Sequence, residues 1–406
     1  MERALLDNQV KVVVATSALG MGFDKPDLGF VIHYQSPGSP IAYYQQVGRA
    51  GRALERADGI LMRGHEDTDI QDYFIRTAFP PKSQAEAVVW LLQDQAIPLT
   101  MSQILAHVNI RRSRLEAMLK VLEVEGALER SGGRWQRTLA PWTYDEERVE
   151  RVTAARRSEQ DAMQRYADGD ECLMWFLRHE LDDPGAEPCG RCANCTGTRS
   201  DVQLEPSVVE AAKRYLRSPD LPIEPRSTWP PSLRERHGRI PEDHRLQPGR
   251  ALSTYNDGGW GELVRRGKSG DGRFSDELVR VSAEMITARW RPEPFPGWVT
   301  CVPSLTHPEL VPEFAVRLAA PLRLPFHAVI EKTRQNPPQK EMENSAQQFR
   351  NVLGVFRVAG AVPPEPVLLV DDILDSRWTL TVVGEALRVA GSGPVYPFVL
   401  AVAVGR

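Results

Sequence analysis

The sequence contains no long apolar run, few cysteines and no strong excess of either charge. None of its apolar stretches approaches the roughly 20 residues that a helix needs to span a bilayer, and the first residues lack the basic start and apolar stretch of a secretory signal. The net charge of −4 excludes a globally basic coat protein for nucleic acid, while a charged fraction of 26% leaves room for local basic faces. We therefore expect a cytoplasmic protein, associated with the nucleoid if it is bacterial, with no membrane partner.

Two motifs of nucleotide hydrolysis are also absent from the 406 residues. We find neither the GxxxxGK[ST] loop that cradles the β- and γ-phosphates nor an acidic DExH box that would hold Mg²⁺. The stretch GELVRRGKS, residues 261–269, has one residue too many between its glycines. We therefore predict that this chain by itself does not hydrolyse ATP.

Five cysteines are too few for a disulfide framework in so long a chain, and four of them are clustered. Cys172, Cys189, Cys192 and Cys195 have the spacing C-x16-C-x2-C-x2-C. Four thiolates complete a tetrahedral Zn²⁺ site with no open position, which is typical of a structural site. The sequence thus predicts a structural zinc site, and we expect the isolated Cys301 to be buried.

The chain is long enough for about two to four domains. Residues 1–82 contain three short β-rich runs, VKVVVAT, FVIHY and GILMR, separated by glycine-rich turns and the polar helical stretch IAYYQQVGRA. This alternation indicates the edge of an α/β sheet. Because complete parallel sheets usually have more strands, residues 1–82 are expected to be part of a larger domain.

Residues 83–143 have the pattern of a winged helix. A helix over SQAEAVVWLLQDQ precedes two more, which Thr100 with Gln103 and Ser113 with Glu116 open as capping boxes. Two short strands around a Ser-Gly-Gly turn follow. The side chains expected to meet phosphates, or to stack on a base, are Arg111, Arg112, Arg114, Arg134 and Trp135. A solvated basic face on a packing domain is the alternative.

Three further segments follow along the chain. Residues 144–200 form a charged helical stretch that leads into the four cysteines. Residues 201–297 are rich in proline, glycine and arginine, have weak periodicity, and are interpreted as a connecting region. From residue 298 to residue 406 the α/β alternation returns and predicts a second, separate α/β domain.

Two arginines, each preceded by a glycine, suggest an anion site near residue 50. Arg49 and Arg52 follow Gly48 and Gly51, a pattern expected to form a tight helix entry with both guanidinium groups facing one anion. Guanidinium binds phosphate bidentately and stabilises charge on a transferred γ-phosphate. A lone GRxGR pattern is more often a surface helix with solvated arginines.

Two longer stretches carry a family resemblance. ATSALGMGFDKPD, residues 15–27, and YYQQVGRAGR, residues 43–52, resemble motifs V and VI of superfamily-two helicases of the RecQ family. The resemblance implies that residues 1–82 are the C-terminal part of a second RecA-like domain. It implies that Thr16 and Ser17 contact the nucleic-acid backbone and that Gly20 and Gly22 allow a close backbone approach. Asp24 would lie near the ribose or the attacking water. Gln45, Arg49 and Arg52 would contact the ATP phosphates, with the two arginines as arginine fingers.

The cysteine region also resembles that of RecQ helicases, in which zinc supports the motor and the region contacts DNA. The order differs from the common one, because the predicted winged helix lies between Arg52 and Cys172. The resemblance implies the C-terminal portion of an ATP-dependent 3′–5′ DNA helicase that uses ATP and Mg²⁺. The implied partners are a missing N-terminal motor domain and DNA that is single-stranded or has a single-strand/duplex junction. A DNA-binding fragment without motor activity is an alternative.

The last segment suggests a third possibility, a phosphoribosyltransferase. In VLLVDDILDSRWTL two acidic residues end a buried strand and a loop opens a helix, which is where open α/β sheets bind phosphate ligands. This loop resembles the phosphoribosyl pyrophosphate loop of type I phosphoribosyltransferases, and residues 331–356 resemble ComF-type proteins. The resemblance implies ribose contacts for Asp371 and Asp372, 5′-phosphate contacts for Asp375, Ser376 and Thr379, and pyrophosphate contacts for Lys332 and Arg334. Arg377 and Trp378 depart from the family's small residues.

The expected architecture is therefore a multidomain α/β protein. It combines a partial RecA-like domain, a winged helix, a four-cysteine zinc module and a C-terminal domain similar to type I phosphoribosyltransferases.

Overall fold

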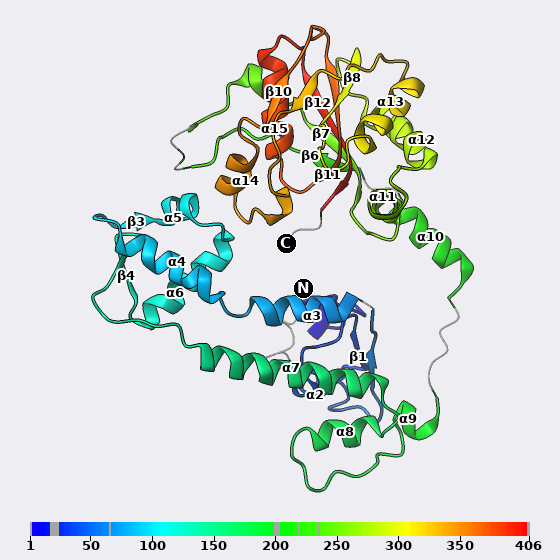
Figure 1. Cartoon of the computed structure of the whole chain (residues 1–406). Helices are drawn as coiled ribbons and strands as arrows, with labels where there is room; N and C mark the ends of the chain where they lie inside the picture. Colours follow the sequence, from blue (N-terminus) through cyan, green and yellow to red (C-terminus); the bar gives the residue numbers. More distant parts are fainter. Residues whose placement is uncertain are drawn as a thin grey trace. The chain divides into compact units, whose positions relative to one another are not determined.

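The computed structural model describes residues 2–16, 24–64, 66–198, 204–217, 220–231, 233 and 236–403. The chain forms two compact units, each built from two separate segments (Figure 1). Unit 1 contains residues 1–82 and 143–202, and unit 2 contains residues 83–142 and 203–406. Among the helices that are described, none has the length and apolar character needed to cross a membrane.

The first segment of unit 1 has only two strands. β1 (Phe30–His33) and β2 (Asp58–Leu61) pair in parallel, and α2 (Pro40–Val47) connects them. The flanking helices are α1 (Glu2–Leu6) and α3 (Glu66–Thr77). The prediction of a strand over VKVVVAT was wrong, because residues 10–16 have no regular structure and Val14 is 97% exposed. A strand needs a ladder partner, and none pairs with this segment among the described residues.

The second segment of unit 1 packs its helices against the first. It contains α7 (Glu146–Asp168), α8 (Leu173–His179) and α9 (Ala193–Thr196). The Asp145 side chain caps α7 by accepting a hydrogen bond from the Arg148 N–H. A small apolar cluster of Tyr43, Met163, Tyr166 and Leu177 joins α2 to α7 and α8. Residues on both sides of the inserted segment 83–142 therefore share one core.

Unit 2 begins with three helices and a hairpin, at the positions predicted for them. The helices are α4 (Lys82–Gln93), α5 (Met101–His107) and α6 (Arg112–Val124), and the antiparallel sheet has the order β3 (Leu99–Thr100), β5 (Arg134–Arg137), β4 (Leu128–Ser131). The capping box of Thr100 and Gln103 is confirmed. The box predicted at Ser113 was wrong, since α6 begins two residues earlier, at Arg112, and Arg111 occupies its N-cap without a side-chain hydrogen bond.

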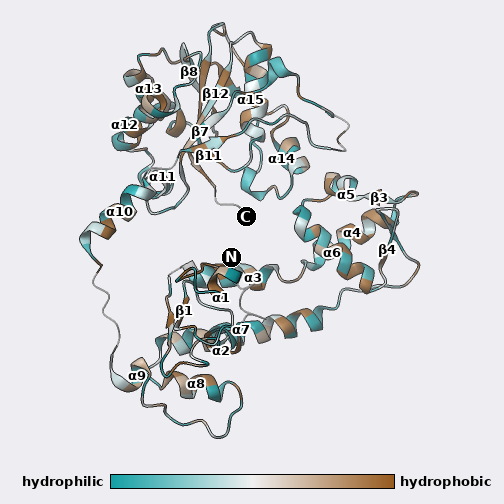
Figure 2. Ribbon diagram, turned by 180° about the vertical axis from the view of Figure 1, so that it is seen from behind, coloured by the Kyte–Doolittle hydropathy of each residue, from teal (hydrophilic) through white to brown (hydrophobic). Residues whose placement is uncertain are grey.

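The rest of unit 2 is a five-stranded sheet with helices on both faces. The strand order is β6 (Leu221–Ile223), β7 (Gly249–Thr254), β12 (Val395–Val402), β11 (Val367–Leu374), β8 (Trp298–Cys301). Only β6 runs antiparallel to its neighbour. The first four residues of β11 are all buried, which is typical of a parallel strand covered on both faces, and Figure 2 colours β11 and β12 as hydrophobic.

The segment interpreted as a connecting region contributes to this sheet. Residues 201–297 supply β6, β7, α11 (Trp260–Arg266) and α12 (Asp276–Glu284). The sequence of β7, GRALST, lacks the β-branched and aromatic residues that mark a strand, so its position in the sheet depends on pairing with β12. This segment also contains α10 (Pro206–Leu216) and the short helical turns η2 (Glu242–His244), η3 (Gly267–Asp271) and η4 (Met285–Trp290).

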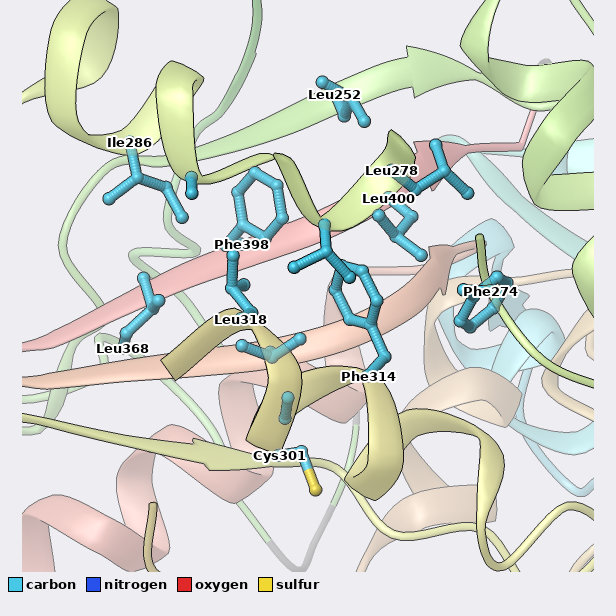
Figure 3. Packing of buried hydrophobic residues seen from close by; sticks show 14 of the residues in the cluster. Leu252, Phe274, Leu278, Ile286, Cys301, Phe314, Leu318, Leu368, Phe398 and Leu400 are labelled. Atoms are coloured by element: carbon cyan, nitrogen blue, oxygen red, sulfur yellow. The ribbon is translucent and has the colours of Figure 1, made fainter. Parts of the chain in front are cut away.

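The helices after neighbouring strands lie on opposite faces of the sheet. On one face, α11, α12 and α13 (Leu310–Leu322) cover a core in which Phe314 and Leu318 meet Phe398 and Leu400 (Figure 3). On the other face lie α15 (Trp378–Val389) and α14 (Ser345–Val352). The small elements between α13 and β11 are β9 (Ile330–Lys332), η5 (Gln339–Glu341) and β10 (Phe356–Val358). The carboxyl ends of β8 and β11 thus form a switch point, where open α/β sheets bind ligands.

Candidate functional site

The four clustered cysteines form a candidate metal centre in unit 1. Their Sγ atoms all lie within 4.8 Å of one another, and the Sγ atoms of Cys172 and Cys192 are 3.9 Å apart. Four thiolates around Zn²⁺ would be separated by about 3.8 Å, given Zn–S bonds of about 2.3 Å. Cys172 is the N-cap of α8 and Cys192 the N-cap of α9, so helix starts position two of the four ligands. The group could hold a metal ion.

Backbone groups already favour a thiolate at this centre. Burial disfavours the charged form of Cys172, but the N–H groups of Cys189 and Trp175 lie 3.2 Å and 3.4 Å from its Sγ, and its pKa falls to about 6. Hydrogen bonding to Cys192 and Cys172 raises the pKa of Cys195 to about 12. Because all four ligands must be thiolates, metal binding would release protons from the cluster.

Arg49 and Arg52 lie in a turn after a helix, not at a helix entry. α2 ends at Val47 with Gly48 as its C-cap, and Gly51 has a φ of +77°. The turn is anchored to the segment before β1, since the N–H of Gly51 donates to Leu28 O and that of Ala53 to Pro26 O, both at 2.9 Å. This anchoring brings the two resembling motifs together.

An ion pair joins the motifs. Nη1 of Arg52 lies 2.8 Å from Oδ1 of Asp24, and both side chains are largely exposed. Gln45 and Thr16 are also exposed, and Arg49 is half-buried. Ser17, Gly20 and Gly22 lie outside the described residues. The structure thus brings Asp24 and Arg52 into contact, while the other expected contacts to ATP and nucleic acid stay predictions.

An aromatic network connects α2 to the metal region. The rings of Tyr43 and Tyr166 lie 5.2 Å apart, and those of Tyr166 and Phe176 lie 5.7 Å apart. Tyr43 also packs on His33, whose Nε2 is 2.7 Å from Oε1 of Gln46. Burial lowers the pKa of His33. The helix that precedes the arginine turn therefore rests on the same helices that carry Cys172.

The basic residues expected to meet DNA are not equally available. Arg112 is exposed at the start of α6, whereas Nη1 of Arg114 lies 3.5 Å from the carboxylate of Glu343. Arg134 donates to Pro98 O at 3.2 Å. The expectation that Trp135 stacks on a base was wrong, because this side chain is only 4% exposed and packs in the core of the hairpin. Alternation along β5 turns it inward.

A second candidate site lies at the carboxyl end of β11. Burial and the charge of Asp372 raise the pKa of Asp371 to about 8. Oδ2 of Asp372 is 2.7 Å from Nζ of Lys268. The buried thiol of Cys301, at the end of β8, has its pKa raised to about 12 by burial and then by the charge of Asp371. Cys301 is therefore buried as expected, beside an acidic pair.

Sequence reasoning missed the role of Lys268. In the sequence its segment resembles an imperfect phosphate loop, but Trp260–Arg266 form α11. At the start of this helix the N–H groups of Gly259 and Gly261 donate to Oδ1 of Asp257, at 2.8 Å and 3.0 Å. A Cβ on Gly261 would lie 1.8 Å from Thr254 O, so this glycine permits α11 to approach β7. The available signal was the acidic pair Asp371 and Asp372, which has no obvious cationic partner nearby in the sequence and so requires one from elsewhere in the chain.

The residues expected to bind the 5′-phosphate lie around the start of α15. Asp375 is exposed, Thr379 is half-buried, and the buried Ser376 accepts a hydrogen bond from Nε2 of Gln339 at 2.9 Å. Trp378 turns away from the loop into the core, where its indole N–H donates to Oγ of Ser345 at 2.9 Å. The bulky residue after Arg377 therefore does not fill the loop.

Lys332 and Arg334 differ in their surroundings. Burial lowers the pKa of Lys332, while the charge of Asp371 opposes the shift. Arg334 instead donates to Leu353 O at 3.2 Å.

Comparison with known proteins defines the class of the first segment. The family described as the helicase conserved C-terminal domain matches residues 1–54, which contain both motifs and the Asp24–Arg52 ion pair. This match supports a helicase C-terminal region over residues 1–54.

The similar curated proteins are more specific. The chain is 30% identical over 209 residues to the ATP-dependent DNA helicase RecQ of Synechocystis sp., covering 48% of this chain and 40% of that protein. It is 35% identical over 210 residues to RecQ of Bacillus subtilis, covering 51% of this chain and 24% of the relative. ATP-dependent DNA helicase Q1 of Mus musculus is 57% identical over 60 residues, 15% of this chain and 9% of that protein. The matches support a RecQ-family superfamily-two helicase C-terminal portion, and the chain spans less than half of each of these relatives.

Proposed function

We propose that this chain contributes the C-terminal portion of a RecQ-like, ATP-dependent 3′–5′ DNA helicase. The observation that carries the proposal is the arginine turn held against the end of motif V, with Arg52 paired to Asp24 at 2.8 Å. Arg49 and Arg52 would stabilise the γ-phosphate charge, Gln45 would orient the nucleotide, and Asp24 would release Arg52 when ATP and Mg²⁺ bind. Thr16 and Ser17 would contact the DNA backbone.

The other half of the ATP site would come from a first motor domain and the remainder of the second. Support comes from apolar side chains left open on the two-stranded sheet, with Phe30 41%, Ile32 50% and Ile60 44% exposed. A two-stranded sheet is rarely stable without further strands or a covering helix. We propose that these side chains pack against the rest of a RecA-like domain.

DNA binding would involve unit 2 as well. In this proposal α4, α5 and α6 with the hairpin form a winged helix, with α6 as its recognition helix. Such a helix presents its N-terminal residues to DNA. Arg112 would contact phosphate directly, and Arg111, Arg114 and Arg134 would add positive charge around it. Structural Zn²⁺ at the four cysteines would hold α8 and α9 and, through Tyr166, steady α2.

The test is a chimera in which the N-terminal part of the Bacillus subtilis RecQ relative is joined to this chain. We expect DNA-stimulated ATP hydrolysis and unwinding of duplexes with 3′ tails, but not of duplexes with 5′ tails. Arg52→Ala should lower turnover by about 10³-fold while sparing ATP binding, as for other arginine fingers. The matched control is Arg56→Ala, four residues away and 87% exposed beside Asp58. Unchanged turnover in Arg52→Ala would remove it from the finger role.

The alternative without motor activity is a DNA-binding fragment. It predicts DNA binding by the chain with no hydrolysis in any chimera. Hydrolysis by the purified chain alone would instead contradict the inferred absence of a phosphate loop.

A second function is favoured by the acidic site of unit 2. We propose that the C-terminal domain is a ComF-type, phosphoribosyltransferase-like fold that binds phosphoribosyl pyrophosphate. Asp371 and Asp372 lie at the switch point of the sheet, with Lys268 paired to Asp372. Asp375, Ser376 and Thr379 at the start of α15 would take the 5′-phosphate. Calorimetry with phosphoribosyl pyrophosphate should show binding that the double variant Asp371→Ala, Asp372→Ala loses. No heat with either protein would leave this domain structural.

A further inference from the structure

The turn between α5 and α6 is covered by the C-terminal domain of the same unit. Oδ1 of Asn109 accepts a hydrogen bond from the N–H of Glu343 at 2.7 Å, and its Nδ2 donates to Glu341 O at 2.8 Å. Asn344, which is buried, donates to Val108 O at 2.7 Å and to Ile110 O at 3.1 Å. The contact is therefore built from matched donors and acceptors on both sides.

The end of α5 is covered in the same way. Ala106 O accepts from Nε2 of Gln347 at 3.1 Å and from Arg350, and the Ala106 side chain is 3% exposed. Ala106 belongs to one apolar cluster with Phe349 of α14 and Trp378 of α15. Carbonyls at a helix C-terminus have no partner in the helix, so Gln347 and Arg350 satisfy them.

A carboxylate occupies the start of α6. Oε2 of Glu343 accepts from the backbone N–H of Arg111 at 3.2 Å, and the same carboxylate lies 3.5 Å from Nη1 of Arg114. Backbone N–H groups and arginine side chains at a helix N-terminus are the groups that bind a phosphate of DNA. Glu343 therefore presents to α6 the charge and the acceptor atoms that a DNA phosphate would present.

We propose that this contact is a self-blocking one, in which residues 341–350 and DNA compete for the turn before α6. The inference rests on the proposed winged-helix function. A DNA segment cannot reach the N–H of Arg111 while Glu343 and Asn344 hold the turn, so binding through α6 requires unit 2 to open at this surface. Arg112 is exposed outside the contact and supplies the first encounter with DNA.

Two substitutions test the competition in the full-length chain, one that removes a negative charge and one that adds a negative charge. Glu343→Gln removes the carboxylate from α6. Asn344→Asp keeps the oxygen that accepts from the Ala346 and Gln347 N–H groups, but it replaces the donor to Val108 O and Ile110 O with an acceptor. Fluorescence anisotropy with a labelled 3′-tailed duplex should show about tenfold tighter binding for each. Glu343→Gln loses the charge that pairs with Arg114, and Asn344→Asp loses the hydrogen bonds that Asn344 donates to Val108 O and Ile110 O.

The control variant distinguishes release of the turn before α6 from a general effect of removing a negative charge. Glu341→Gln removes an exposed carboxylate two residues away, whose residue contacts Asn109 only through its backbone carbonyl. We expect its DNA affinity to match the unaltered protein. Equal tightening in Glu341→Gln and Glu343→Gln, or weaker binding in Asn344→Asp, would overturn the proposal, because simple repulsion of DNA would then explain the data.

Hydrogen exchange gives an independent readout. In the unaltered chain, saturating duplex should speed amide exchange over residues 341–350; unchanged or slower exchange there would overturn the competition. Adding Arg112→Ala to Glu343→Gln should abolish the increase in DNA affinity that Glu343→Gln causes. If DNA binding depends on Arg112 but Glu343→Gln does not change it, the competition is overturned and the proposed DNA function stands. If no variant binds DNA, the proposed DNA function is overturned as well.

Discussion

Asp371 shows how strongly a protein environment can shift the pKa of a single side chain. Burial and the neighbouring Asp372 raise its pKa from 3.8 to about 8, while Lys268 opposes the shift. A carboxyl whose pKa is higher in the folded state than in the unfolded state favours folding only while it stays protonated. Its stabilising effect is complete below pH 4 and is lost as pH rises towards 8. The thermal midpoint of unit 2 should therefore fall across this range.

The variant Asp371→Asn should flatten that dependence. Each kcal/mol of stability is worth about 2–4 °C in the thermal midpoint of a domain of this size, so the difference is measurable by calorimetry between pH 5 and pH 9. Asp372→Asn is the matched control. It loses the ion pair with Lys268, so its midpoint should drop. Its slope should be reduced but not abolished, because burial, the larger cause, still raises the pKa of Asp371. Equal slopes in Asp371→Asn and the unaltered protein would contradict the assignment.

At the scale of elements, the cysteine region depends on its metal. Residues 183–192 between α8 and α9 contain no helix or strand, and α9 is only four residues long, so few backbone hydrogen bonds hold Cys189 in place. We expect one equivalent of zinc per chain, and Cys189→Ser should lose both the metal and the exchange protection of residues 172–195. Cys301→Ser, far along the chain in β8, should keep its metal. Metal retained by Cys189→Ser would count against a four-thiolate site.

Elements set by residues close together in the chain could be predicted from the sequence. The cysteine spacing, the apolar face of α6 at Leu115 and Leu119, and the strand-loop-helix around Asp371 were readable because each is set by neighbours in the chain. The strand β7 was not, since its burial depends on pairing with β12, about 150 residues away. The buried orientation of Trp135 and the ion pair of Lys268 likewise depend on tertiary contacts.

At the scale of the whole molecule, the chain leaves unit 1 and returns to it at neighbouring points. The hydroxyl of Tyr144 donates to Pro80 O at 2.7 Å, and Nζ of Lys82 lies 3.0 Å from Oε2 of Glu146. Insertions whose two ends lie close together can be removed with little strain, because the entropy of closing the gap changes slowly with loop length. Residues 83–142 are therefore an insertion into unit 1 whose two ends lie close together.

Replacing residues 83–142 with a short Gly-Ser linker should leave unit 1 folded. Its core of Tyr43, Met163, Tyr166 and Leu177 has no member in the deleted segment, so one equivalent of zinc should remain and α7 should keep its exchange protection. Unit 2 should be destabilised, because Phe349 and Trp378 lose their contact with Ala106. A matched deletion that also removes Tyr144 and Glu146 should weaken unit 1. Loss of zinc in the first deletion would show that the inserted segment is needed to build the metal centre, against the division of the chain into these two units.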